Sequence, residues 1–128
     1  MNKLEFKGKP VPKPRMTRAD AWKKRPIVVS YFAFKDEINI QAKIQKFRLG
    51  NCIKVYFYVP MPKSWPEKKK KKMDGKPHKQ KPDLDNYIKA LCDTLLDEDS
   101  GVFYITATKK WARKGKIIVE NLPEYLDY

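Results

Sequence analysis

Two aspartates and a lysine stand close together in the segment 81–89, which reads Lys-Pro-Asp-Leu-Asp-Asn-Tyr-Ile-Lys. One residue separates Asp83 from Asp85, and Lys89 follows Asp85 by four positions. Mg²⁺ prefers oxygen ligands and usually takes one or two protein carboxylates together with phosphate and water. The pair could therefore hold a cation that activates water for phosphodiester hydrolysis. Lys89 could stabilise the charge that builds on the phosphate, or orient the attacking water.

Each of these residues also has a purely structural interpretation. Asp83 follows a proline and precedes a helical pattern, so its carboxylate could cap the first turn of a helix. Asp85 and Lys89 lie one helical turn apart and could form a surface ion pair worth roughly a few tenths of a kcal/mol. The motif has basic surroundings, and a further acidic cluster follows at 97–99. These two features make the metal-binding interpretation about as well supported as the structural one.

The sequence patterns on both sides of this motif predict a small fold that mixes helices and strands. Apolar residues at 84, 88, 91 and 95 recur at helical spacing directly after the aspartates. Period-two and helical patterns predict a short strand at residues 4–6, a helix over 27–47, a strand over 51–60, a helix from 84 to 96, and strands over 102–111 and 116–120. We expect one domain of the α/β (α+β) class, with a single mixed sheet of about four strands and two helices on one face, in the order β-α-β-α-β-β.

The expected helix over 27–47 is apolar on two sides. Its apolar residues fall into two sets: Tyr31, Phe34 and Ile38, and, roughly opposite, Ala33, Ile40, Ile44 and Phe47. A helix that is apolar on two sides is usually buried on two sides. Our hypothesis is that one side packs on the sheet and the other meets a partner subunit. A bend near Asn39 that redirects a single stripe is the alternative.

Charge points to a polyanionic partner. The 128 residues carry a formal net charge of +14, and the isoelectric point is near 9.8. Nucleic acid fits this charge better than an anionic membrane surface, because no amphipathic helix accompanies the lysines. The chain has neither an apolar run long enough to span a bilayer nor a signal peptide, so we expect a cytoplasmic protein. Cys52 and Cys92 lie in apolar contexts and are expected to be buried free thiols.

The positive charge is concentrated in two segments. A proline-rich arm over 7–18 should stay extended and could track a phosphate backbone, although a solvated loop is the alternative. The segment 63–81 has five consecutive lysines, and its glycine, prolines and self-repulsion predict an irregular, mobile basic loop leading into the aspartates. The candidate nucleic-acid-binding residues of these segments and of the start of the first helix are Lys13, Arg15, Arg18, Arg25, Lys69, Lys70, Lys76, His78, Lys79 and Lys81.

The motif at 81–89, followed by Asp93 and by the acidic pair at 98–99 before a strand, resembles the RusA-type Holliday-junction resolvases. The upstream stretch Gly8–Arg15 and the Met-Pro pair at 61–62 resemble phage-encoded members of that family. The resemblance implies a homodimeric Mg²⁺-dependent endonuclease, bacterial or phage-encoded, that resolves four-way DNA junctions by paired symmetric nicks, with Mn²⁺ as a substitute ion. It places the family's essential residues, which are three metal-binding aspartates and a catalytic lysine, at Asp83, Asp85, Asp99 and Lys89.

The third acidic position departs from the family pattern. The linker after the helix is short here, and the acidic pair is Glu98-Asp99, with Asp97 beside it. We assign the third role to Asp99. A straight helix from Asp85 to Leu96 would rise ~16 Å, which separates Asp99 from Asp85 by too much to share one ion. Either the helix ends early and the turn folds back, or the third carboxylate comes from another subunit.

Two function classes remain at this point. One is a structure-selective DNA endonuclease. The other is a non-catalytic nucleic-acid-binding protein, in which the lysines bind the nucleic acid and Asp83 only caps a helix. Both predict binding that weakens steeply with salt. Only the endonuclease loses its activity without metal or after Asp83→Asn.

Overall fold

The computed structural model describes residues 2–21, 25–96 and 101–124. Its elements in chain order are β1 (Lys3–Phe6), the 3₁₀ turn η1 (Arg18–Ala21), α1 (Pro26–Ile44), β2 (Cys52–Pro60), α2 (Glu67–Met73), α3 (Leu84–Leu95), β3 (Tyr104–Ala112) and β4 (Lys116–Asn121). None of the helices in these ranges is long and apolar enough to cross a membrane.

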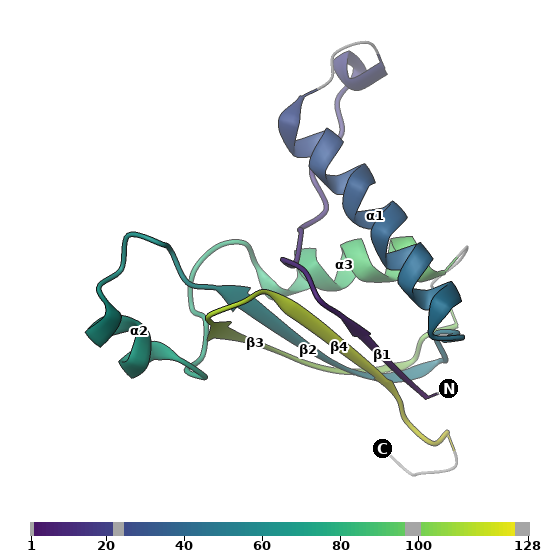
Figure 1. The fold of residues 1–128 in the computed structure, drawn as a ribbon. Helices are drawn as coiled ribbons and strands as arrows, with labels where there is room; N and C mark the ends of the chain where they lie inside the picture. Colours follow the sequence, from purple (N-terminus) through teal and green to yellow (C-terminus); the bar gives the residue numbers. More distant parts are fainter. Residues whose placement is uncertain (1, 22–24, 97–100, 125–128) are drawn as a thin grey trace.

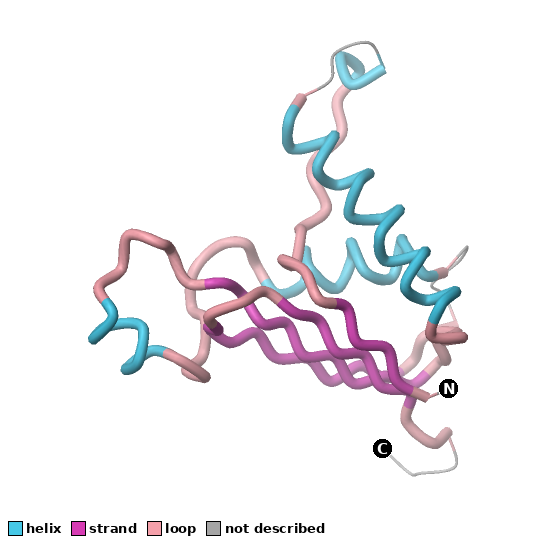
Figure 2. The backbone as a smooth tube through the Cα atoms, in the orientation of Figure 1, coloured by secondary structure: helices cyan, strands magenta, loops and turns pink. Residues whose placement is uncertain are grey.

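The four strands form one mixed sheet in the order β1-β4-β2-β3 (Figure 1). β2 and β3 run parallel, whereas β4 runs antiparallel to both β1 and β2. Helices α1 and α3 both lie on one face of this sheet, and no helix of the described residues covers the opposite face (Figure 2). The predicted fold class, with two helices on one face of a mixed four-stranded sheet, is therefore confirmed.

The core lies between this sheet and its two helices. β2 alternates as predicted, with Ile53, Val55, Phe57 and Val59 buried. Tyr87 of α3 stacks on Phe57, with ring centroids 5.3 Å apart, so the helix that carries the aspartates is fixed to the central strand. Both cysteines are buried thiols outside any disulfide, as expected.

Helix α1 is continuous from Pro26 to Ile44, and Ile40 and Ile44 stay exposed, so the alternative that a bend near Asn39 joins them to a single buried stripe is wrong. Tyr31, Phe34 and Ile38 are buried, which confirms the predicted sheet-facing side. On the opposite side Ile40 and Ile44 are exposed. Phe47 was expected on that side, but the helix has already ended there. The chain turns through Lys46 at φ 53°, and Phe47 is buried.

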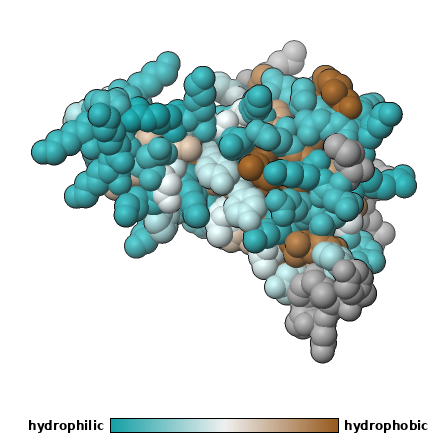
Figure 3. Space-filling view, turned by 60° about the horizontal axis from the view of Figure 1, so that its bottom comes forward, coloured by the Kyte–Doolittle hydropathy of each residue, from teal (hydrophilic) through white to brown (hydrophobic). Residues whose placement is uncertain are grey.

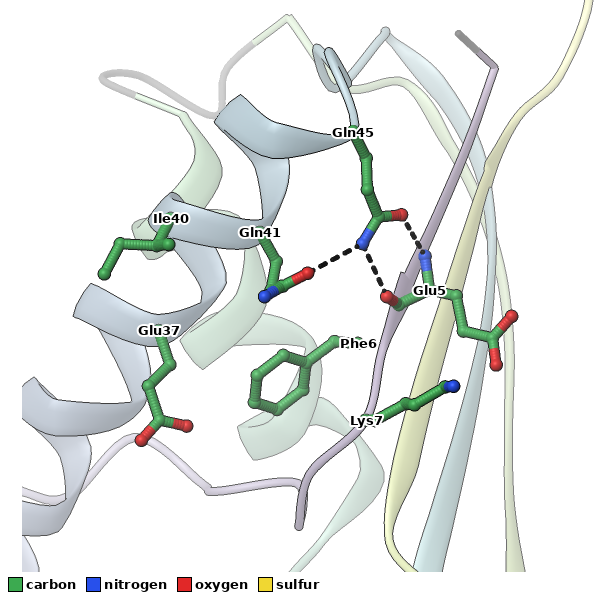
Figure 4. A pocket seen from close by; sticks show the side chains of 7 residues that line it. All are labelled: Glu5, Phe6, Lys7, Glu37, Ile40, Gln41 and Gln45. Atoms are coloured by element: carbon green, nitrogen blue, oxygen red, sulfur yellow. Dashed lines mark hydrogen bonds between the residues drawn. The ribbon is translucent and has the colours of Figure 1, made fainter.

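The end of α1 is tied to the outer strand β1 by one glutamine. The side-chain amide of Gln45 accepts the Glu5 backbone N–H at 3.0 Å and donates to the Glu5 carbonyl at 2.8 Å (Figure 4). It also donates to Oε1 of Gln41 at 3.1 Å. Figure 4 shows Phe6 pointing toward α1, while Glu5 and Lys7 point to the other side of β1. These bonds replace the strand partner that an outer strand lacks.

The segment 63–81 differs from the irregular loop that its composition predicted. Residues Glu67–Met73 form the helix α2, which includes the five lysines. Gly75 has φ 79° and begins the return of the chain to the sheet, where Pro77 bridges Lys110 of β3. The order comes from Trp65, which packs on Trp111 at a ring distance of 4.8 Å. We call residues 63–81 the basic lobe; it projects beyond one end of the sheet (Figure 1).

Candidate functional site

The two aspartates stand at the start of α3. Asp83 is the N-cap residue, with extended backbone angles (φ −66°, ψ 148°), and Asp85 is the second residue of the helix. Asp83, Asp85 and Lys89 are all exposed. The sequence places them there because Pro82 disfavours helix before it, and the stripe of apolar residues after it turns one face of α3 to the core.

Neither structural interpretation of these residues is realised. The Asp83 carboxylate accepts no hydrogen bond from the first turn of α3, although its backbone carbonyl accepts the Asn86 N–H at 3.1 Å. Asp85 and Lys89 form no ion pair, and among the described residues the ion pairs are Lys13–Asp93, Arg25–Asp20 and Arg113–Glu67. Both carboxylates are thus left available to a ligand.

A lysine on β3 holds the chain that leads into the aspartates. The ammonium of Lys109 donates to the carbonyl of Gln80 at 2.5 Å and to that of Pro82 at 2.7 Å. Lys109 pairs with Phe57 in the register of the sheet, so it lies on the face that carries the helices. Its bonds fix the residues directly before Asp83. We infer that Lys109 is a positioning residue for this motif.

The proline-rich arm packs against α3 and forms a cleft beside the aspartates. The backbone N–H of Lys13 bonds the Asn86 carbonyl at 3.3 Å. A cleft of about 460 Å³ is lined by Lys13, Pro14, Arg15, Met16, Asn86 and Lys89. The structure therefore brings the predicted arm residues Lys13 and Arg15 together with the predicted catalytic Lys89, one helical turn after Asp85.

Lys13 is also fixed by a carboxylate of α3. Its ammonium lies 2.5 Å from Oδ2 of Asp93. Burial, and after it the charge of Asp93, raise the pKa of Tyr31, so α1, α3 and the arm meet at this point. Asp93 thus holds the arm in place, and Arg15 of the arm stays exposed.

The other two predicted arginines lie elsewhere. Arg18 is in η1, and Arg25 occupies the N-cap position of α1, at the end of the helix that projects from the sheet (Figure 1). Arg25 pairs with Asp20 at 2.7 Å and donates to the carbonyl of Arg15 at 2.9 Å. Arg25 is the main cause that lowers the pKa of Asp20 to about 2. Its guanidinium therefore braces the arm, whereas Arg18 is exposed.

The basic lobe presents most of its predicted lysines to solvent. Lys72, Lys76 and Lys79 share a hollow of about 320 Å³ beside Trp111. Lys69 lies over the Trp65 ring, 4.1 Å from its centroid, and Lys70 is half-buried. Lys81, next to the aspartates, is exposed. The lobe is thus a cationic surface that ends at the carboxylate pair.

His78 is the exception within the lobe. It is 4% exposed, and its ring lies 4.3 Å from that of Trp111. Burial, and next the charge of Lys109, lower its pKa, so the ring stays neutral at pH 7. The structure thus shows His78 covered rather than open to solvent, and DNA binding by His78 stays a prediction. Its role is to pack the lobe on β3.

Sequence reasoning missed Lys109 and Lys72. The signal for Lys109 was its position in the alternation of β3, where Ile105, Ala107 and Trp111 share its face. A lysine on a packed face needs hydrogen-bond acceptors for its ammonium. Lys72 belongs to a run of five lysines, and only the helical geometry of α2 decides which of them faces the hollow.

The third acidic position, Asp97, Glu98 or Asp99, lies outside the described residues. Helix α3 runs to Leu95, with Leu96 as its C-cap, so the alternative of an early end is wrong. In the described ranges, no three His, Cys, Asp or Glu side chains gather closely enough to hold a metal. Asp83 and Asp85 alone match Mg²⁺, which takes one or two carboxylates and completes its shell with water and phosphate oxygens. The donors present therefore fit a hard divalent cation.

A comparison with protein families decides between the two function classes. The family model described as endodeoxyribonuclease RusA matches residues 7–120, which is nearly the whole chain. No curated protein matches the chain. Members of the matching family are divalent-metal-dependent endodeoxyribonucleases acting on Holliday junctions, so the non-catalytic alternative is set aside. The chain belongs to the RusA family of endodeoxyribonucleases.

Proposed function

We propose that this endonuclease resolves four-way DNA junctions by paired symmetric nicks and that Mg²⁺, or Mn²⁺ in its place, is held by Asp83 and Asp85. The proposal rests on the exposed position of these two carboxylates. Both are exposed at the start of α3, neither caps the helix nor pairs with Lys89, and the arm and the basic lobe surround them with positive charge.

The side chains around the pair have separate tasks. Arg15 and the lobe lysines bind backbone phosphates, and Lys109 keeps the start of α3 in place. Lys89, in the cleft beside Arg15, stabilises the negative charge that develops on the scissile phosphate. Asp83 and Asp85 would hold a divalent cation, which when bound would supply an activated water and neutralise phosphate charge. Asp99 is proposed as the third acidic ligand, from the same chain or from a partner subunit.

Cleavage of a synthetic four-way junction tests this function. With Mg²⁺ we expect two nicks at symmetric positions in opposed strands of an end-labelled junction, and no cutting of a linear duplex of the same sequence. EDTA should stop the cutting, and Mn²⁺ should restore it. Tight junction binding without any nicks under either ion would refute the proposal.

We also propose that the protein acts as a homodimer formed through the outer side of α1. Val29, Phe32, Ile40 and Ile44 are each half or more exposed on this side, opposite the buried stripe of the same helix. Side chains of this kind in a row are expensive to leave in water. A two-fold dimer would present one carboxylate pair to each of two opposed junction strands.

Replacing two of these side chains should separate the subunits. Phe32→Glu combined with Ile40→Glu places charge in an apolar interface, and sedimentation velocity at micromolar concentration should change from dimer to monomer. The exposed position Lys71→Glu gives the same change of net charge on α2 and should leave the dimer intact. A wild-type protein that sediments as a monomer would exclude this interface.

A further inference from the structure

The face of the sheet opposite the helices has a composition of its own. Because side chains alternate along a strand, the partners of the buried positions share this second face. It carries Lys54, Tyr56 and Tyr58 from β2, Thr106, Thr108 and Lys110 from β3, and Lys116, Ile118 and Glu120 from β4. We call this surface the open face. Figure 3 shows it with the hydrophilic basic lobe at its left and residues of intermediate hydropathy near its middle.

The register of the sheet places Tyr58 between two lysines. Tyr58 pairs with Lys116 on one side and with Lys110 on the other. The ammonium of Lys116 lies 5.0 Å from the centroid of the Tyr58 ring. The neighbouring Tyr56 ring is nearly parallel to that of Tyr58, with an interplanar angle of 22° and a centroid distance of 6.5 Å. Two aromatic rings thus stand in a row with cations beside them.

A cleft continues this row toward the basic lobe. It has a volume of about 760 Å³ and lies between the end of β1, the turn between β3 and β4, and the lobe. Gly115 makes the turn pack closely here, because a Cβ on it would lie 2.6 Å from Cα of Lys9. Tyr58 contributes to the lining, where four lysines outnumber two carboxylates: Lys7, Lys9, Lys114 and Lys116 against Glu5 and Asp74.

We propose that the open face and its cleft form a second nucleic-acid site, which binds single-stranded DNA. Tyr58 and Tyr56 stack on successive bases. The lysines that line the cleft, and those beside the two tyrosine rings, bind the phosphates. Single strands fit this chemistry because their base faces are accessible, whereas those of a duplex are covered by neighbouring bases. The site lies across the sheet from Asp83 and Asp85, so it stands independently of the cleavage proposed above.

Binding of a single-stranded oligonucleotide tests the site. We expect a fluorescein-labelled oligothymidylate of about 20 nucleotides to bind the wild type at 150 mM salt, measured by anisotropy. Tyr58→Ala should weaken this binding about tenfold, because one base–aromatic stack is lost. Tyr58→Trp should retain it. Phe103→Ala removes another exposed aromatic, just before β3, and should have little effect.

Photo-crosslinking locates the bound strand independently of affinity. A strand containing 5-iododeoxyuridine should crosslink to the peptide that carries Tyr56 and Tyr58. Cleavage of a four-way junction by Tyr58→Ala should match that by the wild type. Crosslinks confined to the arm and the basic lobe, or unchanged affinity in a folded Tyr58→Ala protein, would overturn the proposal.

Discussion

Asp83→Asn and Asp85→Asn should each abolish junction cleavage while leaving junction binding intact. Each change removes an anionic oxygen ligand from the pair at the start of α3. Several kcal/mol of transition-state stabilisation then disappear, and since about 1.4 kcal/mol is a factor of ten in rate, we expect a loss of roughly 1,000-fold or more. Binding should stay equal or become tighter, because one negative charge near the phosphates is gone.

Single-turnover cleavage and gel-shift binding, measured on the same junction, separate the two effects. Glu124→Gln is a matched control, because it removes an exposed carboxylate beyond the end of β4, outside α1 and α3. It should leave both measurements unchanged. Stability should not change in the aspartate variants either, because the Asp83 side chain does not cap α3. A variant that cuts within tenfold of the wild-type rate would remove its residue from the site.

Trp111→Ala should cause a large loss of stability. Trp111 is 4% exposed and lies between the rings of Trp65 and His78, so its removal leaves a cavity on β3. Truncations of this kind cost about 3–5 kcal/mol. For a domain of this size, we expect the melting temperature to fall by about 10–20 °C in calorimetry or circular dichroism.

Trp65→Ala is the comparison for this experiment. Trp65 is half-buried and belongs to the basic lobe itself, so its loss should free the lobe and lower the melting temperature by less than Trp111→Ala does. Both variants should bind DNA more weakly than the wild type, because the lobe lysines no longer share one fixed surface. Equal melting temperatures for Trp111→Ala and the wild type would contradict the assigned packing.

The sheet and the two helices that cover it were predictable because their patterns are long and regular. In β2, buried and half-buried residues alternate over the eight positions from Ile53 to Pro60, and in α3 the apolar residues recur on one face of the helix. The aspartate motif itself indicated its position at a helix start, whereas the metal binding that it suggests stays a prediction. For such segments local pattern and tertiary packing agree, so the sequence alone is sufficient.

The basic lobe was not predictable in the same way. Lys, Glu and Met each favour a helix, but five consecutive lysines repel one another and a helix of seven residues is too short to be stable alone. The order comes from contacts distant in sequence, above all Trp65 with Trp111 and the Arg113–Glu67 ion pair. The burial of His78 and the bonds of Lys109 to Gln80 and Pro82 depend on the same long-range pairing of the lobe with β3. The local sequence pattern of one segment gives no information about partners that lie far away along the chain.

The outer strands of the sheet have consequences for how copies of this protein meet. The backbone of Glu5 in β1 is bonded by Gln45, and the end of β3 is bonded by residues 75–78, with Gly75 and His78 as donors and Lys76 as an acceptor. An outer strand blocked in this way resists strand-to-strand growth into fibrils. Copies of the protein therefore associate through side-chain surfaces rather than through strand edges. We expect the protein to stay in solution at a higher concentration during expression than its open face alone would suggest.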